Sequence, residues 1–272
     1  YRVGKWQHKK ETQIMSEKPV RHVLGLSGGK DSAALAIYLK DEGLAPDIEY
    51  FFTDTGAELP EIYESLDKLE TYLGKEILRL NSGRDFEHHL KIHGHFLPSA
   101  RQRWCTREMK IKPFEKFVGD DEVVSYIGIR ADEDREGYIS RRPNIKPVFP
   151  FKEAGLVRED IFRILENSVG VPEYYKWRSR SGCYFCFFQQ RREWLGLAKH
   201  HPELFEKAKK FEKVGNINGE YYTWVDGMTL DELVSKAKQM GSSGRSTDSK
   251  SWKELLAAVE DDEDQACLIC SL

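Results

Sequence analysis

A glycine-rich hexapeptide between an apolar run and a helical segment most constrains the fold of this chain. Residues 27–32 read Ser-Gly-Gly-Lys-Asp-Ser. The apolar run His22–Leu26 before them predicts a buried strand, and Ala33–Leu39 after them predicts a buried helix. Glycines let the backbone turn sharply and point its N–H groups at an anion, and the positive end of the following helix faces the same place. The pattern predicts a strand–loop–helix unit that binds phosphate.

Strand and helix patterns then alternate along the chain, which is typical of a doubly wound, mostly parallel sheet of the α/β class. Beyond residue 150 the pattern becomes helical, around an irregular segment that carries cysteines at Trp177–Phe188. The strands predicted after the first are Ile48–Phe52, Glu76–Leu80 and Val123–Ile129; the helices are Glu61–Leu73, Lys110–Phe117, Arg158–Asn167 and Glu193–Val214. In Glu61–Leu73 the apolar positions Ile62, Leu66, Leu69 and Leu73 follow the helical repeat.

The side chains of the hexapeptide also suit a bound nucleotide. Ser27 and Ser32 supply hydroxyl donors, Gly28 and Gly29 supply backbone N–H groups, and Lys30 supplies a cation. Asp31 is a carboxylate in a phosphate cradle, which is understandable if it holds Mg²⁺. The spacing differs from a Walker A loop, which reads G-x-x-x-x-G-K-[ST].

Two further segments follow predicted strands, at the edge where ligands bind in parallel sheets. The second strand runs into Asp54-Thr55-Gly56-Ala-Glu58, where Asp54 and Glu58 suit a ribose hydroxyl, a water or Mg²⁺. The alternative is that Asp54-Thr55-Gly56 only forms a turn and binds no ligand. The fourth strand leads to Arg130 and Arg135, whose guanidinium groups would stabilise charge on a phosphate.

The five cysteines fall into two C-x-x-C pairs and a single residue. The pairs are Cys183–Cys186 and Cys267–Cys270, and Cys105 stands alone. Because no hydrophobic leader segment is recognisable, we expect a reducing compartment, the cytoplasm, where such spacings indicate metal or redox chemistry rather than structural disulfides. From the residues alone, zinc and an iron–sulfur cluster both remain open.

The charge distribution points to an anionic ligand. The net charge is −3, but residues 101–200 hold 20 lysines and arginines against 15 acidic residues. This excess suits a nucleotide or a nucleic-acid backbone, and a solvated basic face is the alternative. No apolar run approaches the roughly 20 residues that span a bilayer, so we expect no membrane partner.

The hexapeptide resembles the S-G-G-x-D-S signature of PP-loop ATP pyrophosphatases. The segments 54–61 and 128–135 resemble those of the phosphoadenosine phosphosulfate (PAPS) reductase branch of that group. The resemblance implies that ATP is cleaved between its α- and β-phosphates. It implies catalytic roles for Ser27, Lys30, Asp31 and Arg130, and nucleotide contacts from residues 27–32 and from Asp54, Thr55, Gly56 and Glu58.

The cysteine segments resemble those of cluster-bearing PAPS-reductase-like proteins. This implies a 4Fe-4S cluster on Cys105, Cys183 and Cys186, with Cys270 or Cys267 as the fourth ligand, or with one iron left open for sulfide; zinc is the alternative. The chain lacks the E-C-G-x-H tail of assimilatory PAPS reductases. It also has Trp104-Cys105 where cluster-bearing adenylylsulfate reductases have two adjacent cysteines. Both differences weaken a sulfonucleotide reductase interpretation.

The combination of loop, C-T-R-x-x-K-I-x-P-F segment and G-C-x-F-C knuckle resembles the PP-loop subunit of bacterial DNA phosphorothioation systems of the Dnd/Ssp type. This implies adenylylation of an acceptor oxygen for sulfur insertion, with DNA as acceptor, a cysteine desulfurase as sulfur donor, and other DNA-modification subunits as partners. The alternatives are a tRNA thiolation enzyme, a sulfonucleotide reductase and a non-enzymatic nucleotide sensor. A homodimer is left open.

From these features we expect four regions. Residues 1–20 are an N-terminal extension, and 21–150 are the PP-loop ATP-binding domain. Residues 151–240 are a helical region with the C-x-x-C pair. Residues 241–272 are a linker, a helix and a cysteine tail, and we expect this tail to fold back onto the cysteine site.

Overall fold

A computed structural model describes residues 19–44, 47–134, 142–212 and 222–241 of the chain. Five parallel strands form one sheet in the order β3-β2-β1-β4-β5. The strands are β1 Arg21–Gly25, β2 Ile48–Thr53, β3 Ile77–Leu80, β4 Val123–Tyr126 and β5 Ile145–Val148. The chain winds outward from β1 to β2 and β3 on one side, and then to β4 and β5 on the other. The predicted doubly wound α/β fold is therefore confirmed.

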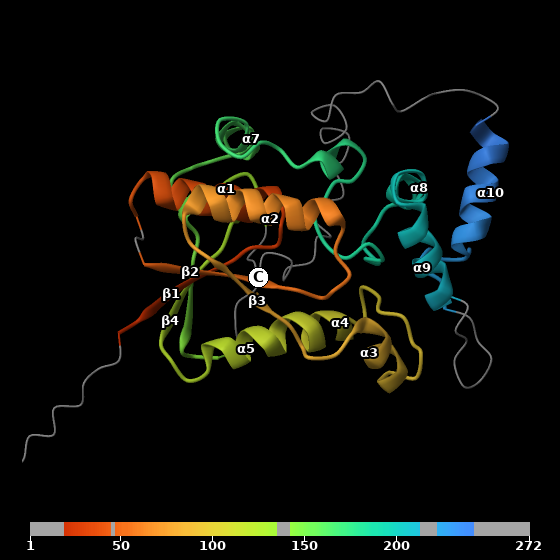
Figure 1. Ribbon diagram of the computed structural model, residues 1–272, viewed down its shortest axis with the longest axis horizontal. Coiled ribbons are helices and arrows are strands. Elements are labelled where there is room, and N and C mark those ends of the chain that lie inside the picture. Colours follow the sequence, from red (N-terminus) through yellow and green to blue (C-terminus); the bar gives the residue numbers. More distant parts are fainter. Residues whose placement is uncertain (1–18, 45–46, 135–141, 213–221, 242–272) are drawn as a thin grey trace, which may run out of the picture.

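Helices cover both faces of the sheet (Figure 1). On one face lie α1 Lys30–Asp41, α2 Pro60–Leu73 and α7 Arg158–Glu166, and on the other lie α3 Phe86–Ile92, α4 Trp104–Thr106 and α5 Lys112–Val118. A π-helix, η1 Arg107–Ile111, joins α4 to α5. The remaining helices are α6 Pro150–Glu153, the 3-10 helix η2 Glu173–Lys176, α8 Arg191–His200, α9 Pro202–Glu212 and α10 Leu230–Gly241. The predicted helical, cysteine-bearing C-terminal region is present.

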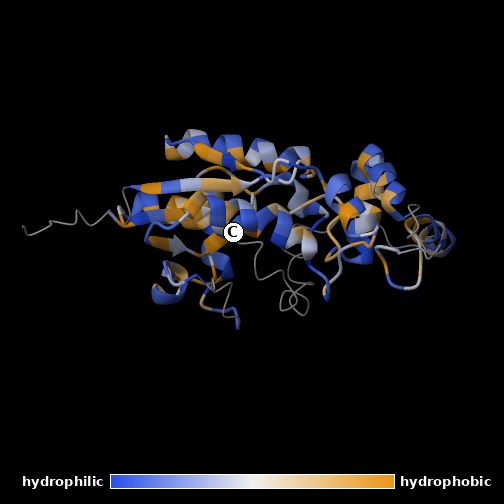
Figure 2. Ribbon diagram, turned by 90° about the horizontal axis from the view of Figure 1, so that it is seen from below, coloured by the Kyte–Doolittle hydropathy of each residue, from blue (hydrophilic) through white to orange (hydrophobic). Residues whose placement is uncertain are grey.

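Alternation along the strands sends apolar side chains to both helical layers. Leu24 of β1 belongs to the larger core, with α1, α2 and α7, whereas Val23 packs with Phe51 and Phe114 under α5. The four apolar positions predicted on α2 are its four buried residues. Figure 2 shows blue and orange residues interspersed along the same helices, as expected where one helix face is buried and the other is exposed. No helix among the described residues has the length and apolarity needed to span a membrane.

Some boundaries differ from the sequence prediction. The predicted helix Glu193–Val214 is two helices, α8 and α9, because Pro202 lacks the N–H that a continuous helix would need. Strand β4 ends at Tyr126 rather than Ile129, and Gly128-Ile129-Arg130 forms an irregular turn toward the ligand edge of the sheet. The predicted linker, helix and cysteine tail of residues 242–272 lie outside the described residues.

Candidate functional site

The glycine-rich loop closes on itself through its two serines. The Ser27 N–H donates to Ser32 Oγ at 3.1 Å, and the two hydroxyl oxygens are 3.2 Å apart. The Gly29 N–H donates to Ser27 Oγ at 3.3 Å. The loop leaves β1 and enters α1, whose first residue is Lys30. The predicted strand–loop–helix unit therefore exists, and its N–H groups gather at the N-terminus of α1.

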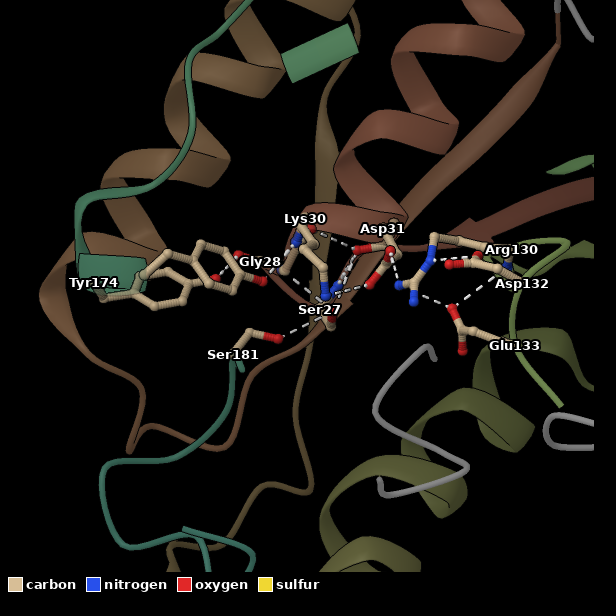
Figure 3. A network of polar contacts seen from close by, with 12 residues as sticks. Ser27, Gly28, Lys30, Asp31, Arg130, Asp132, Glu133, Tyr174 and Ser181 are labelled. Atoms are coloured by element: carbon tan, nitrogen blue, oxygen red, sulfur yellow. Dashed lines mark hydrogen bonds and ion pairs between the residues drawn. The ribbon is translucent and has the colours of Figure 1, made fainter. Parts of the chain in front are cut away.

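Two adjacent tyrosines of η2 contact the loop, and Figure 3 labels the first of them, Tyr174. The Tyr174 hydroxyl donates to the Gly28 carbonyl at 2.7 Å, and the Lys30 N–H donates to the Tyr175 hydroxyl at 2.9 Å. Both side chains are buried, and burial raises the pKa of each phenol. Each phenol is therefore neutral and can serve as a hydrogen-bond donor or acceptor. Sequence reasoning missed this pair because it lies about 145 residues from the loop and has no local signal.

Asp31 joins the two cations of the site. Its carboxylate lies 3.2 Å from Lys30 Nζ and 3.0 Å from Arg130 Nη1 (Figure 3). Burial alone would raise the pKa of Asp31, but the attraction of Lys30 and Arg130 outweighs it and lowers the pKa to about 2. Asp31 is therefore ionised at neutral pH. The predicted contact with Mg²⁺ stays a prediction.

Arg130 reaches this position from the turn after β4. Its side chain is only 4% exposed, and it also lies 3.0 Å from both Asp132 Oδ1 and Glu133 Oε1. Gly128 permits the approach, because a Cβ at this position would lie 2.9 Å from the Asp31 carbonyl oxygen. Asp31 and Arg130 thus meet between β1 and β4, where the strand order changes from one side of the sheet to the other and where open α/β sheets bind ligands. Arg135, predicted beside Arg130, lies outside the described residues.

The segment after β2 connects this loop to the cysteines. Asp54 accepts hydrogen bonds from the Gly56 N–H and from the Tyr63 hydroxyl, both at 2.8 Å. The bond from Gly56 shows that Asp54 stabilises a turn. The Thr55 hydroxyl donates to Glu58 Oε1 at 2.8 Å and lies 3.1 Å from Cys183 Sγ. Glu58 is buried, and its Oε2 has no partner among the described residues. The nucleotide roles predicted for these residues stay predictions.

Three cysteines line one small apolar cavity. Cys105, Cys183 and Cys186 border a cavity of about 40 Å³ together with Thr55, Met109, Lys110, Phe185, Phe187 and Phe188. None of the three thiols is in a disulfide. The π-helix η1 begins directly after α4 and carries Met109 and Lys110. The structure therefore brings together the three cysteines that the resemblance assigned to one site.

Burial raises the pKa of the Cys183 thiol well above its usual value, and the neighbouring Glu58 carboxylate raises it further. Lys110 acts in the opposite direction. Within the described part of the chain, no three His, Cys, Asp or Glu side chains are arranged as a formed metal site. Cys267 and Cys270 lie outside it, so their roles as a fourth ligand stay predictions.

The cysteine segment, defined here as residues 178–190, contacts the loop through Ser181 and is held in place by further polar contacts. Ser181 Oγ donates to Ser27 Oγ at 3.4 Å, and the Arg178 guanidinium donates to the Cys183 carbonyl at 2.8 Å. Glu193 is fully buried and accepts from the N–H groups of Ser179 and Gln190, at 2.6 and 3.0 Å. Sequence reasoning missed Arg178 and Glu193, since isolated charged residues carry no pattern.

Part of the chain is similar in sequence to a known protein family. Residues 21–151 match the phosphoadenosine phosphosulfate reductase domain family. Two similar proteins are uncharacterized proteins of Methanocaldococcus jannaschii. One is 31% identical over 211 residues, covering 73% of this chain and 42% of the relative. The other is 26% identical over 212 residues, covering 73% and 49%. The chain therefore spans less than half the length of either relative.

Among solved structures, the chain is similar to the PAPS reductase of Candida auris in its phosphate complex. The TM-score is 0.48 at 15% sequence identity, over 61% of this chain and 82% of that one.

Proposed function

We propose that this protein is an ATP pyrophosphatase that adenylylates an acceptor oxygen so that sulfur can replace it, with the DNA backbone as the first candidate acceptor. One observation carries the proposal: the phosphate loop and the thiols adjoin. Ser181 contacts Ser27 of the loop, and two residues further along Cys183 contacts Thr55 of the segment after β2. ATP activation and sulfur delivery would take place on neighbouring surfaces.

The residues of the loop suit cleavage between the α- and β-phosphates. The acceptor oxygen would attack the α-phosphorus, the bond to the bridging oxygen would break, and pyrophosphate would leave with the electron pair. Lys30 and Arg130, held at one end of the loop by Asp31, would stabilise the charge on that leaving group. Sulfur at the oxidation level of sulfide would then attack the activated acceptor, and AMP would leave with the original oxygen.

The cysteine cavity fits an iron–sulfur cluster by the chemistry of its donors. Thiolates are the usual ligands of such clusters, and Cys105, Cys183 and Cys186 border one cavity with an apolar wall. Lys110, on the same wall, would offset part of the negative charge of bound thiolates. A bound cluster would carry or position the sulfur. Zinc would use the same thiols, so metal analysis has to separate the two.

A second candidate, a sulfonucleotide reductase, is favoured by the match of residues 21–151 to the PAPS reductase domain. A reductase would use two electrons from a dithiol reductant to release sulfite and a nucleoside phosphate from PAPS or adenylylsulfate, and it would not need ATP. The two functions therefore differ in substrate and in product.

The discriminating experiment is mass spectrometry of nucleosides from cells with the intact gene, with the gene deleted, and with a Ser27→Ala variant. The proposal predicts phosphorothioate dinucleotides or thiolated tRNA nucleosides that vanish in both altered strains. If neither appears and the purified protein, supplied with a dithiol reductant, instead converts PAPS or adenylylsulfate to sulfite, the reductase is the function.

A further inference from the structure

A larger groove opens beside the cysteine cavity. It has a volume of about 640 Å³, and its lining includes Arg180, Phe187, Phe188, Gln189, Gln190 and Tyr222. We call it the aromatic groove. Phe187, Phe188 and Pro98 line both this groove and the cysteine cavity, so the two spaces share a wall.

The position of the groove follows from the course of the cysteine segment. Ser181 contacts the phosphate loop, and Cys183 and Cys186 line the cavity. Phe187 and Phe188 form the shared wall, and Gln189 and Gln190 line the groove. Nucleotide loop, thiols and groove therefore occur in that order along one short segment. A molecule held in the groove would therefore lie next to the cavity that the thiols line.

The lining combines flat aromatic surfaces with a cation. The rings of Phe187 and Phe188 have centroids 4.4 Å apart, and the Arg180 guanidinium lies 5.4 Å from the Phe188 centroid. Among the described residues, no carboxylate forms an ion pair with Arg180, so its charge is available to an anion. Aromatic rings with an interleaved arginine form the kind of surface on which nucleic-acid bases stack while a phosphate is neutralised.

The groove also holds a buried amide with unused hydrogen-bonding capacity. Gln189 is 7% exposed, and its amide nitrogen donates to the Tyr184 carbonyl at 2.7 Å. Its Oε1 is buried and has no hydrogen-bond partner among the described residues. A buried carbonyl oxygen without a donor is costly, and a base N–H is one group that would satisfy it. Asp226, also in the lining, offers a second acceptor.

We propose that the aromatic groove is the acceptor site and binds single-stranded nucleic acid, with a base stacked on its rings and a phosphate at Arg180. This inference rests on the proposed function and specifies its acceptor. A base paired within a duplex cannot insert its face between side chains, so the groove requires an unpaired or extruded nucleotide. DNA and RNA share this chemistry, and the experiment separates them.

The test is fluorescence anisotropy without ATP. The purified protein is titrated into a labelled 12-nucleotide single strand, as DNA and as RNA, and into the corresponding duplexes. We expect each single strand that binds to bind at least about tenfold more tightly than its duplex, since base stacking contributes about 1–3 kcal/mol per base. Tighter binding of DNA or of RNA identifies the acceptor polymer, and either outcome supports the groove.

Variants locate the binding site. Tyr222→Leu removes a ring that lines only the groove and should weaken single-strand binding about 5- to 100-fold. Arg180→Gln should weaken it and reduce the salt dependence by about one phosphate contact, a slope change of about 0.7. The control is Arg163→Gln on α7, which removes the same charge from an exposed position and should change neither binding nor slope. Circular dichroism checks that each variant is folded.

Equal binding of single strand and duplex, or single-strand binding that Tyr222→Leu and Arg180→Gln both leave unchanged, overturns the inference. Pyrophosphate release from ATP by the unaltered protein is measured in parallel. If pyrophosphate is released but the strands do not bind, the groove assignment fails alone. If the strands bind as expected but pyrophosphate is never released, the proposed function fails and the groove remains a nucleic-acid site.

Discussion

Replacing Gly28 with alanine should destabilise the protein by about 2–4 kcal/mol, and the structure separates two contributions. Gly28 has φ +69°, a left-handed conformation that costs a residue with a Cβ about 1 kcal/mol. The added Cβ would also lie 2.4 Å from Cγ2 of Ile62, which is fully buried. Overpacking of that kind costs about 1–3 kcal/mol more. The loop would have to move, and its hydrogen bond to Tyr174 would be disturbed.

A matched control isolates the contact. Gly74, at the end of α2, has φ +66° and nothing within 4 Å of an added Cβ, so Gly74→Ala should cost only about 1 kcal/mol. Ile62→Leu removes Cγ2, and in that background Gly28→Ala should cost about as little as Gly74→Ala. Urea unfolding of the four proteins and the double variant measures each free energy of unfolding. Equal losses for Gly28→Ala and Gly74→Ala would refute the packing argument.

Three further predictions concern the polar and metal-binding residues. Because the pKa of Asp31 is lowered to about 2 from its ordinary 3.8, its ionised form contributes about 2 kcal/mol above pH 4, and this is lost as pH falls from 4 to 2. Urea unfolding should therefore give Asp31→Asn a lower free energy of unfolding than the parent at pH 6, and the difference between the two proteins should narrow toward pH 3. A difference that stays constant with pH would contradict the ion-pair account. Glu193→Ala leaves the N–H groups of Ser179 and Gln190 without an acceptor and should cost about 2–4 kcal/mol in urea unfolding, whereas Glu193→Gln, which keeps one acceptor oxygen, should cost less. Protein purified anaerobically should be brown and contain iron and sulfide, both lost in Cys183→Ser and reduced when residues 265–272 are deleted. One stoichiometric zinc in colourless protein would contradict the cluster, and full occupancy after the deletion would remove Cys270 as a ligand.

The elements with strong periodicity could be predicted from the sequence, and those set by long-range packing could not. The apolar stripe of α2 was predicted to the residue, and the loop at residues 27–32 lies where its glycines indicated. Strand β5 was missed because Ile145-Lys-Pro-Val is short and contains a proline, a residue that sheets tolerate at their edges. It is an edge strand here.

The site shows the same division. Asp31 and Arg130 were each selected, but their mutual ion pair depends on the pairing of β4 beside β1, which no local pattern encodes. The gathering of Cys105 with Cys183 and Cys186 was expected from resemblance and not from spacing, since about 80 residues separate them along the chain. Tyr174 and Tyr175 contact the loop because the fold brings η2 against it from about 145 residues away. No local sequence pattern marks such a contact, so these tyrosines could not be selected from the sequence.

The central claim, that this loop directs cleavage of ATP between the α- and β-phosphates, is tested most directly by identifying the products. The purified protein is incubated anaerobically with ATP, Mg²⁺, sulfide and a single-stranded oligonucleotide, and phosphorus NMR follows the nucleotides. AMP and pyrophosphate should appear in equal amounts, and Asp31→Asn should abolish both. ADP and inorganic phosphate as products, or no AMP with any acceptor, would contradict the account.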